Sequence, residues 1–198
     1  MPVSTDRKAA SHARILDAAS RAIRREGYGG VNVTEVMRAA QLTHGGFYAH
    51  FASRDALLAE AVEQAGADID RVLREQGDRL VAGGASPLRA FVEIYLSMAH
   101  VRDCDNGCPV SLLSGEMFRQ PPTVATPSRR LITQMHARVK KVLPADAPRE
   151  AAWAVVSTLL GAVQLARALA GSDEKAAAAV LADTRKDLLA RYDSDRPQ

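Results

Sequence analysis

Residues 41–51 read QLTHGGFYAHF, an unusual composition for a helix. Gly45 and Gly46 are adjacent, and each glycine destabilises a helix by roughly 1 kcal/mol relative to alanine. Phe47 and Phe51 are four residues apart, so in a helix they lie on one face and can pack together. The tyrosine and the second histidine point elsewhere. The pattern therefore predicts a short helix with an aromatic inner face and a slim, polar outer face.

Helical patterns flank this segment on both sides. Residues 11–26 place apolar side chains at three- and four-residue steps. In residues 32–40, Asn32 and Glu35 have the spacing of a capping box at a helix start. A long helix is expected over residues 54–81. Two short helices joined by about three residues, with longer helices on either side, are typical of a helix-turn-helix unit.

The rest of the chain also follows helical patterns. Aromatic residues are scarce, at 5%, and no strand-like alternation of polar and apolar residues occurs. The sequence therefore predicts an all-α fold of about nine helices, with a loop at residues 119–127. The further helices are expected at residues 87–100, 111–118, 128–142, 149–170 and 173–192.

The charge of the chain is concentrated at its amino-terminal end. The formal net charge is +3. Residues 1–58 contain eight basic and five acidic side chains, whereas the two signs balance over the rest of the chain. A basic end on a neutral body is a weak indication of a polyanionic partner.

Cysteine content and hydropathy indicate a cytoplasmic protein. Two cysteines in 198 residues favour a reducing compartment over a disulfide scaffold. The amino-terminal residues lack the apolar core of a signal peptide. The most apolar stretch, residues 151–166, contains polar residues and falls short of the roughly 20 apolar residues that span a bilayer. We expect it to be a buried helix.

A family resemblance rests on residues 33–62, which read VTEVMRAAQLTHGGFYAHFASRDALLAEAV. The segment from residue 15 to residue 62 resembles the TetR family of bacterial transcription regulators. The matching features are the apolar positions of the first helix, Gly27 before the turn, the FYAHF cluster, and Arg54 followed by the ALL run. The remaining three-quarters of the chain has the length and helix count expected of the family, but its sequence is not diagnostic.

The resemblance implies two domains and a function. Residues 1–58 correspond to a three-helix DNA-binding domain, and residues 59–198 to a helical ligand-binding and dimerisation domain. A sequence-specific transcription regulator is implied, by family default a repressor that a small-molecule inducer releases from a palindromic operator. We expect a homodimer with no enzyme activity, no metal or other cofactor, and no membrane association.

The glycine-rich segment is the expected DNA reader. A helix that enters the major groove must present small or polar residues to the bases and phosphates. By resemblance, Tyr48, His50 and Arg54 correspond to phosphate contacts, and the THGG segment to base-facing positions. Many relatives carry side chains where this chain has two glycines, so DNA shape is expected to contribute to specificity. The residues expected to contact DNA are Thr34, Thr43, His44, Gly45, Gly46, Tyr48, His50 and Arg54.

The carboxy-terminal part is expected to form the dimer and the inducer pocket. In the family the last two helices pair with those of a second copy, and residues 149–170 carry enough apolar surface for two faces. The expected dimer residues are Val155, Val156, Leu159, Val163, Leu181 and Leu188. The expected pocket residues, each individually a normal core residue, are Phe91, Tyr95, Met98, Met117, Phe118, Met135, Trp153 and Gln164.

The segment RDCDNGCP, residues 102–109, leaves an alternative open. Cys108 precedes a predicted helix start, where the pKa of a thiol is lowered and the reactive thiolate is favoured. A repressor that senses oxidants or electrophiles through Cys108, and secondarily Cys104, is the alternative. Asp103 and Asp105 oppose a thiolate, and the common role of such a cysteine is packing.

Two other classes of protein fit the sequence less well. A helical cysteine enzyme using Cys108 would need a base and a group to orient it, and only His100 and His136 lie outside the amino-terminal region. No phosphate-binding loop or metal motif accompanies them. A non-specific architectural DNA binder is disfavoured by the modest charge and the long neutral half.

Overall fold

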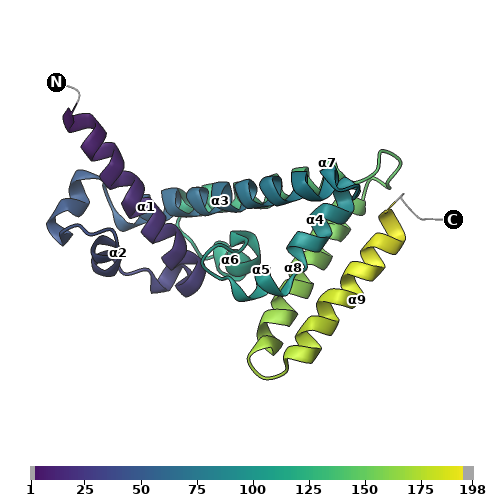
Figure 1. Cartoon of the computed structure of the whole chain (residues 1–198). Helices are drawn as coiled ribbons and strands as arrows, with labels where there is room; N and C mark the ends of the chain where they lie inside the picture. The colour runs from purple at the N-terminus through teal and green to yellow at the C-terminus, as the bar shows by residue number, and fades with distance from the viewer. Residues whose placement is uncertain (1–2, 194–198) are drawn as a thin grey trace. The chain divides into compact units, whose positions relative to one another are not determined.

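The computed structural model describes residues 3–193, and this part of the chain is entirely helical (Figure 1). It contains nine α-helices and one 3-10 helix, which confirms the all-α prediction. The elements are α1 (Val3–Gly30), α2 (Val33–Ala39), η1 (His44–Ala49), α3 (Arg54–Ala82), α4 (Pro87–Tyr95), α5 (Met98–Arg102), α6 (Pro109–Met117), α7 (Pro122–Val142), α8 (Ala151–Ala170) and α9 (Glu174–Tyr192).

The chain divides into two compact units. The first comprises residues 1–68 and 104–131, and the second comprises residues 69–103 and 132–198. Helices α3 and α7 each continue from one unit into the other. The domain boundary after residue 58 remains a prediction from the family resemblance.

The first unit is built around α1, which packs against α2 and α6. Its core is apolar, as the spacing predicts: Ile15, Ile23 and Leu57 are completely buried. Helix α1 bends at Gly27, whose φ of 73° and ψ of 177° lie outside the helical region. Glycine adopts this positive φ without the steric cost that a side chain imposes. The bend leads the chain into α2.

The second unit is built around the antiparallel pair α8 and α9, with α4 packed on α9 and α5 on α8. Within the described residues, α8 is the single helix long and apolar enough to cross a membrane. In the most apolar window of α8, 39% is buried inside the chain. The prediction of a buried helix is therefore correct for one of its faces.

Several predicted boundaries differ from the structure. Residues 122–127 belong to α7 and are not loop. Pro122 is at the first turn, where its missing amide has no helical partner, whereas Pro127 lies inside the helix. The predicted helix 87–100 is two helices, since Ser97 adopts an extended conformation and its side chain accepts from His100 N to begin α5. Helix α1 also extends beyond the predicted range at both ends.

Candidate DNA-binding surface

Helices α2 and η1 form a tight two-helix arrangement. Asn32 caps α2, because its side chain accepts hydrogen bonds from Thr34 N and Glu35 N at 2.9 and 3.4 Å. The turn after α2 places Gln41 at a φ of 59°, the left-handed region that few side chains adopt. Thr43 precedes η1 in an extended conformation, and its side chain makes no capping bond.

The outer face of this pair is polar and exposed. Thr34, Thr43 and His44 are exposed, and Thr34 Oγ1 lies 3.2 Å from His44 Nδ1. This contact connects the first turn of α2 to the first turn of η1. Tyr48 is 74% exposed, an unusual state for an aromatic side chain that makes an edge contact with a buried phenylalanine. The structure thus brings these four predicted contacts together around the glycines.

The protein itself gives no reason for glycine at positions 45 and 46. Neither residue has a positive φ. A Cβ at Gly45 would meet no atom within 4 Å, and one at Gly46 would make ordinary contacts with Met37 and Thr43 at 3.7 and 3.9 Å. Since alanine is favoured over glycine in helical segments, the missing side chains cost stability without improving internal packing.

The inner face is aromatic, as predicted. Phe47 and Phe51 are each 2% exposed, and their ring centroids lie 5.7 Å apart. Phe51 also stacks on His12 of α1 at 4.6 Å. Short aromatic contacts thus fix η1 to α1 from one side and leave the other side open.

His50 lies between the two faces. Its Nδ1 is buried without a hydrogen-bond partner among the described residues. Burial lowers the pKa of His50, and the positive charges of His12 and Lys8 lower it further. His12 is held in turn by Glu60, with Nε2 2.9 Å from Oε2. His50 is therefore uncharged at neutral pH, and its role as a phosphate contact remains a prediction.

Arg54 is engaged inside the protein. Its Nε donates to Val31 O at 3.2 Å, and its Nη2 donates to Tyr28 O and, at 3.4 Å, to Gly29 O. These carbonyls belong to the end of α1 and the link to α2. The Arg54 guanidinium therefore holds the link that leads into the helix-turn-helix, and its contact with phosphate remains a prediction.

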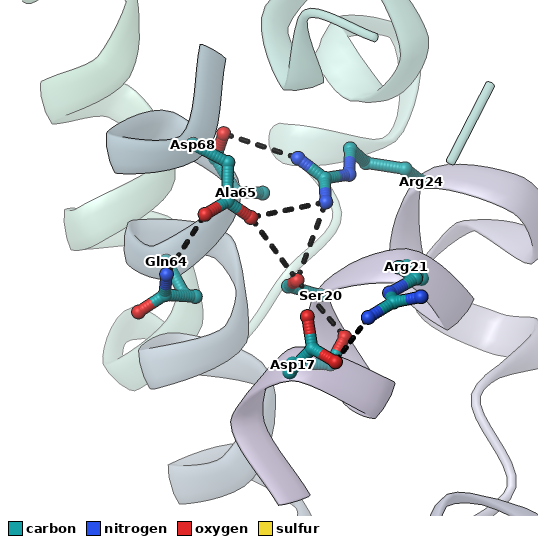
Figure 2. Close-up of polar contacts among 7 residues, drawn as sticks. All are labelled: Asp17, Ser20, Arg21, Arg24, Gln64, Ala65 and Asp68. Carbon is teal, nitrogen blue, oxygen red and sulfur yellow. Dashed lines mark hydrogen bonds and ion pairs between the residues drawn. The ribbon is translucent and has the colours of Figure 1, made fainter. Parts of the chain in front are cut away.

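A buried polar cluster fastens α1 to α3 (Figure 2). The Arg24 side chain is 1% exposed and donates to Asp68 Oδ2 at 3.2 Å, to Ser20 Oγ and to Ala65 O. Gln64 donates to the other oxygen of Asp68 at 2.9 Å. In the sequence, Arg24 is only one of the eight basic residues among residues 1–58. Its position on the apolar side of α1, four residues after Ser20, is the signal that identifies it.

The residues predicted to form the dimer interface are instead buried inside the single chain. Val155, Val156, Leu159, Val163, Leu181 and Leu188 are each at most 3% exposed in the single chain. They are buried within one protomer, in which α8 packs on α9 and α5. A different stripe of α8 is exposed, and it includes Ser157, Gly161 and Leu165.

The predicted pocket residues do not line one cavity. Phe91, Tyr95 and Met135 do meet in the second unit: the two rings lie 5.8 Å apart, and Tyr95 Oη lies 3.9 Å from Met135 Sδ. Phe118 is 75% exposed beneath Arg119. Trp153 is 49% exposed, stacks on His136 and lines a separate groove of about 580 Å³, so its pocket role remains a prediction. The other three candidates differ in burial: Met117 is buried, Met98 is half-buried and Gln164 is exposed.

The two cysteines are free thiols in the first unit. Cys108 is 4% exposed and stands at the start of α6, as predicted, followed by a proline. Cys104 is half-buried. Burial limits access of an oxidant to Cys108, so the structure adds no support to thiol sensing.

Comparisons with known proteins agree with this geometry. The family described as "Bacterial regulatory proteins, tetR family" matches residues 15–61. A search of curated proteins finds no match. A TetR-family regulator from Agrobacterium tumefaciens is 20% identical, with a TM-score of 0.73, over 93% of this chain and 98% of the other.

Two further solved structures share the fold. A TetR regulator from Chloroflexus aurantiacus is 21% identical, with a TM-score of 0.74, over 93% of this chain and 95% of the other. A TetR-family regulator from Cytophaga hutchinsonii is 16% identical, with a TM-score of 0.76, over 96% of this chain and 98% of the other.

The short helix pair and its polar outer face, on an all-helical body, define a DNA-binding regulator of the helix-turn-helix class. Residues 15–61 match the TetR family of transcription regulators, and the chain shares its fold with TetR-family structures along nearly its whole length.

Proposed function

We propose that this protein is a cytoplasmic, sequence-specific transcription regulator that binds a palindromic operator as a homodimer. It acts through DNA binding and has no enzyme activity. By family default it is a repressor. The observation that carries the proposal is the exposed face of α2 and η1, where polar side chains surround two glycines that the protein's own packing does not require.

Each part of this face has a physical role toward DNA. The bare backbone at Gly45 and Gly46 allows the duplex to approach closely. His44 and Thr43 supply hydrogen-bonding groups for base edges. The Tyr48 hydroxyl extends into solvent, where it can bind a phosphate, and phosphate contacts set the register of the protein on the duplex.

The exposed faces of α8 and α9 support the homodimer. On α8 the exposed stripe combines small residues with Leu165, which is 59% exposed. On α9 the exposed positions include Ala178, Ala179 and Ala182. Small side chains allow helices to approach closely, and an exposed leucine gains from burial. Leu165→Glu should convert the dimer to a monomer in sedimentation, whereas Phe118→Glu should not.

A groove in the second unit supports binding of a small-molecule inducer. It lies among α3, α4 and α7 and has a volume of about 570 Å³, a size typical of ligand sites. Of the predicted pocket residues it contains Phe91 alone. Its apolar lining is formed by Leu73, Val81, Pro87, Ala90, Phe91 and Val142, and its charged lining by Asp70, Arg74, Asp78, Arg138 and Lys141.

A binding comparison tests the proposal. Fluorescence anisotropy at fixed salt would compare DNA flanking the protein's own gene with a scrambled duplex, because affinities for DNA depend strongly on salt. We expect clear preference for the flanking DNA. Equal binding to both would contradict sequence specificity, and absence of binding would contradict DNA regulation.

A matched pair of variants locates the surface. Tyr48→Ala should lower operator affinity by roughly tenfold, the effect of losing about 1.4 kcal/mol of contact. Phe118→Ala removes an aromatic side chain of nearly equal exposure from elsewhere in the same unit, and should leave affinity unchanged. Equal effects of the two substitutions would contradict the proposed surface.

A further inference from the structure

Tyr28, near the link between α1 and α2, is hydrogen-bonded to three other helices. This residue is 1% exposed and directly follows the bend at Gly27. Its backbone N–H, its backbone carbonyl and its side-chain hydroxyl each bind a side chain from a different helix. Those helices are α6, α3 and α7, and all the residues involved belong to the first unit.

The amide of Tyr28 binds α6. Tyr28 N donates to Glu116 Oε2 at 3.1 Å. The carboxylate lies directly over Gly27, because a Cβ at that position would be 2.5 Å from Glu116 Oε1. Glycine suits this position through its positive φ, and a side chain here would in addition displace the Glu116 carboxylate.

The hydroxyl of Tyr28 binds α7. Tyr28 Oη lies 2.6 Å from Ser128 Oγ, and both residues are buried. The single hydroxyl proton of Ser128 is directed to Val124 O at 2.7 Å. Tyr28 is therefore the donor to Ser128. Burial, followed by the charge of Glu116, raises the pKa of Tyr28 to about 12, so this proton is retained at neutral pH.

Opposite charges hold the two ends of the Tyr28 backbone. The Glu116 carboxylate accepts from its N–H, and the Arg54 guanidinium donates to its C=O. Hydrogen bonds that involve a charged group are about twice as strong as neutral ones. Arg54 also donates to the Val31 carbonyl, and the Val31 side chain is buried. These contacts restrict the backbone between Tyr28 and the start of α2 at Val33.

We propose that Glu116 is a positioning residue for operator recognition: by holding the Tyr28 amide, it fixes the orientation of α2 and η1 relative to α6. This inference rests on the proposed binding of a palindromic operator. Glu116 touches no DNA in this scheme. It acts through Tyr28, and its loss allows the helix-turn-helix to tilt on the link between α1 and α2.

A positioning role predicts a change in geometry as well as in affinity. A dimer that reads two half-sites requires a definite distance between them, since each reading head must enter the major groove. If Glu116 orients the head, its removal weakens the preference for one half-site spacing. A residue that only stabilises the fold would instead weaken binding equally at every spacing.

The experiment uses the full-length protein and an operator selected from a random-sequence duplex pool. From it, a series of duplexes is made in which the half-site spacing is changed by one or two base pairs in each direction. Affinity is measured on each by anisotropy, with thermal unfolding in parallel. We expect Glu116→Ala to lower operator affinity about tenfold at the preferred half-site spacing, the effect of losing one hydrogen bond to a charged group. At the other spacings the loss of affinity should be smaller.

Three further variants make the result specific. Glu116→Gln retains an oxygen that accepts from Tyr28 N and should preserve the preference. Glu116→Asp retains the charge but is one methylene shorter, and should behave like the alanine variant while folding more reliably. Glu63→Ala removes an exposed ion pair with Arg130 in the same unit and should change nothing.

The outcomes separate this inference from the proposed function. A flatter or shifted spacing profile in the alanine and aspartate variants, rescued by glutamine, supports the positioning role. An unchanged profile, or an equal loss at every spacing, overturns it while leaving operator binding intact. Wild-type protein that shows no spacing preference overturns both.

Discussion

Two polar regions of the first unit differ in how their side chains are used. Near the end of α1, the buried Arg24 pairs with Asp68 of α3, and the buried Tyr28 binds side chains of α3, α6 and α7. On the outer face of α2 and η1, polar groups are exposed, and Thr34 contacts His44. The first arrangement holds the shape of the reading head. The second leaves hydrogen-bonding capacity for a partner outside the chain.

The comparison predicts that disrupting the first region costs stability. Asp68→Ala leaves the buried Arg24 without its carboxylate and should lower the free energy of unfolding by about 3 kcal/mol, because an uncompensated buried charge is costly. Urea denaturation measures this. Asp17→Ala removes an exposed partner of Arg21 and should cost less than about 1 kcal/mol. Similar losses in the two variants would show that burial of the Arg24 pair has no energetic importance.

A smaller loss is expected at the hydroxyl of Tyr28. Tyr28→Phe removes one buried hydrogen bond and should cost about 1–2 kcal/mol. The folded pKa is raised from 10 to about 12, so the stabilisation by the neutral hydroxyl is complete below pH 10 and is lost as the pH rises toward 12. Wild-type stability should therefore fall more steeply than that of Tyr28→Phe between pH 10 and 12. Parallel curves would contradict the assignment.

Sequence reasoning and structure agree where local patterns decide the outcome. The apolar period of α1, the Asn32 cap and the Phe47–Phe51 spacing concern neighbours within a few residues, and each was predictable. The Arg24–Asp68 pair spans 44 residues in sequence. A single sequence contains no information that would pair those two charges, so this buried contact was not predicted.

The same distinction explains the errors in the carboxy-terminal part. Both faces of α8 are apolar enough to be buried, and periodicity does not say which face packs on α9 of its own chain. The six residues expected at the dimer interface face inward. Arg54 is similarly ambiguous, because a basic residue after the aromatic cluster looks the same in sequence whether it binds phosphate or backbone carbonyls.

In the second region, a substitution should improve stability and impair function. Gly45→Ala should raise the free energy of unfolding by about 0.5 kcal/mol, since a Cβ there meets no atom and alanine is favoured. Operator affinity should fall, because the methyl group stands where the duplex approaches. Gly77→Ala, at another open glycine in α3, should bring a similar gain without a loss of affinity. Unchanged affinity in Gly45→Ala would remove the close-approach argument.

The smallest expected effect belongs to His50, which lies between the two regions. Its pKa is lowered by burial and by His12 and Lys8, so the folded state favours the neutral ring. The contribution of the neutral ring to the free energy of unfolding is complete above the ordinary histidine pKa of about 6.5. It is lost as the pH falls through the lower pKa of the folded state. His50→Gln should therefore be less sensitive to acid than wild type.

The His50 measurement is a difference between variants, so that contributions common to both proteins cancel. Burial lowers the pKa of His100 to about 4, and this contribution is common to both proteins. Operator affinity of wild type should stay level from pH 8 to 7, since a neutral His50 contributes a hydrogen bond and no charge. An affinity that rises steadily over that range as the pH falls would place a charged His50 against phosphate, and would assign it to the exposed region.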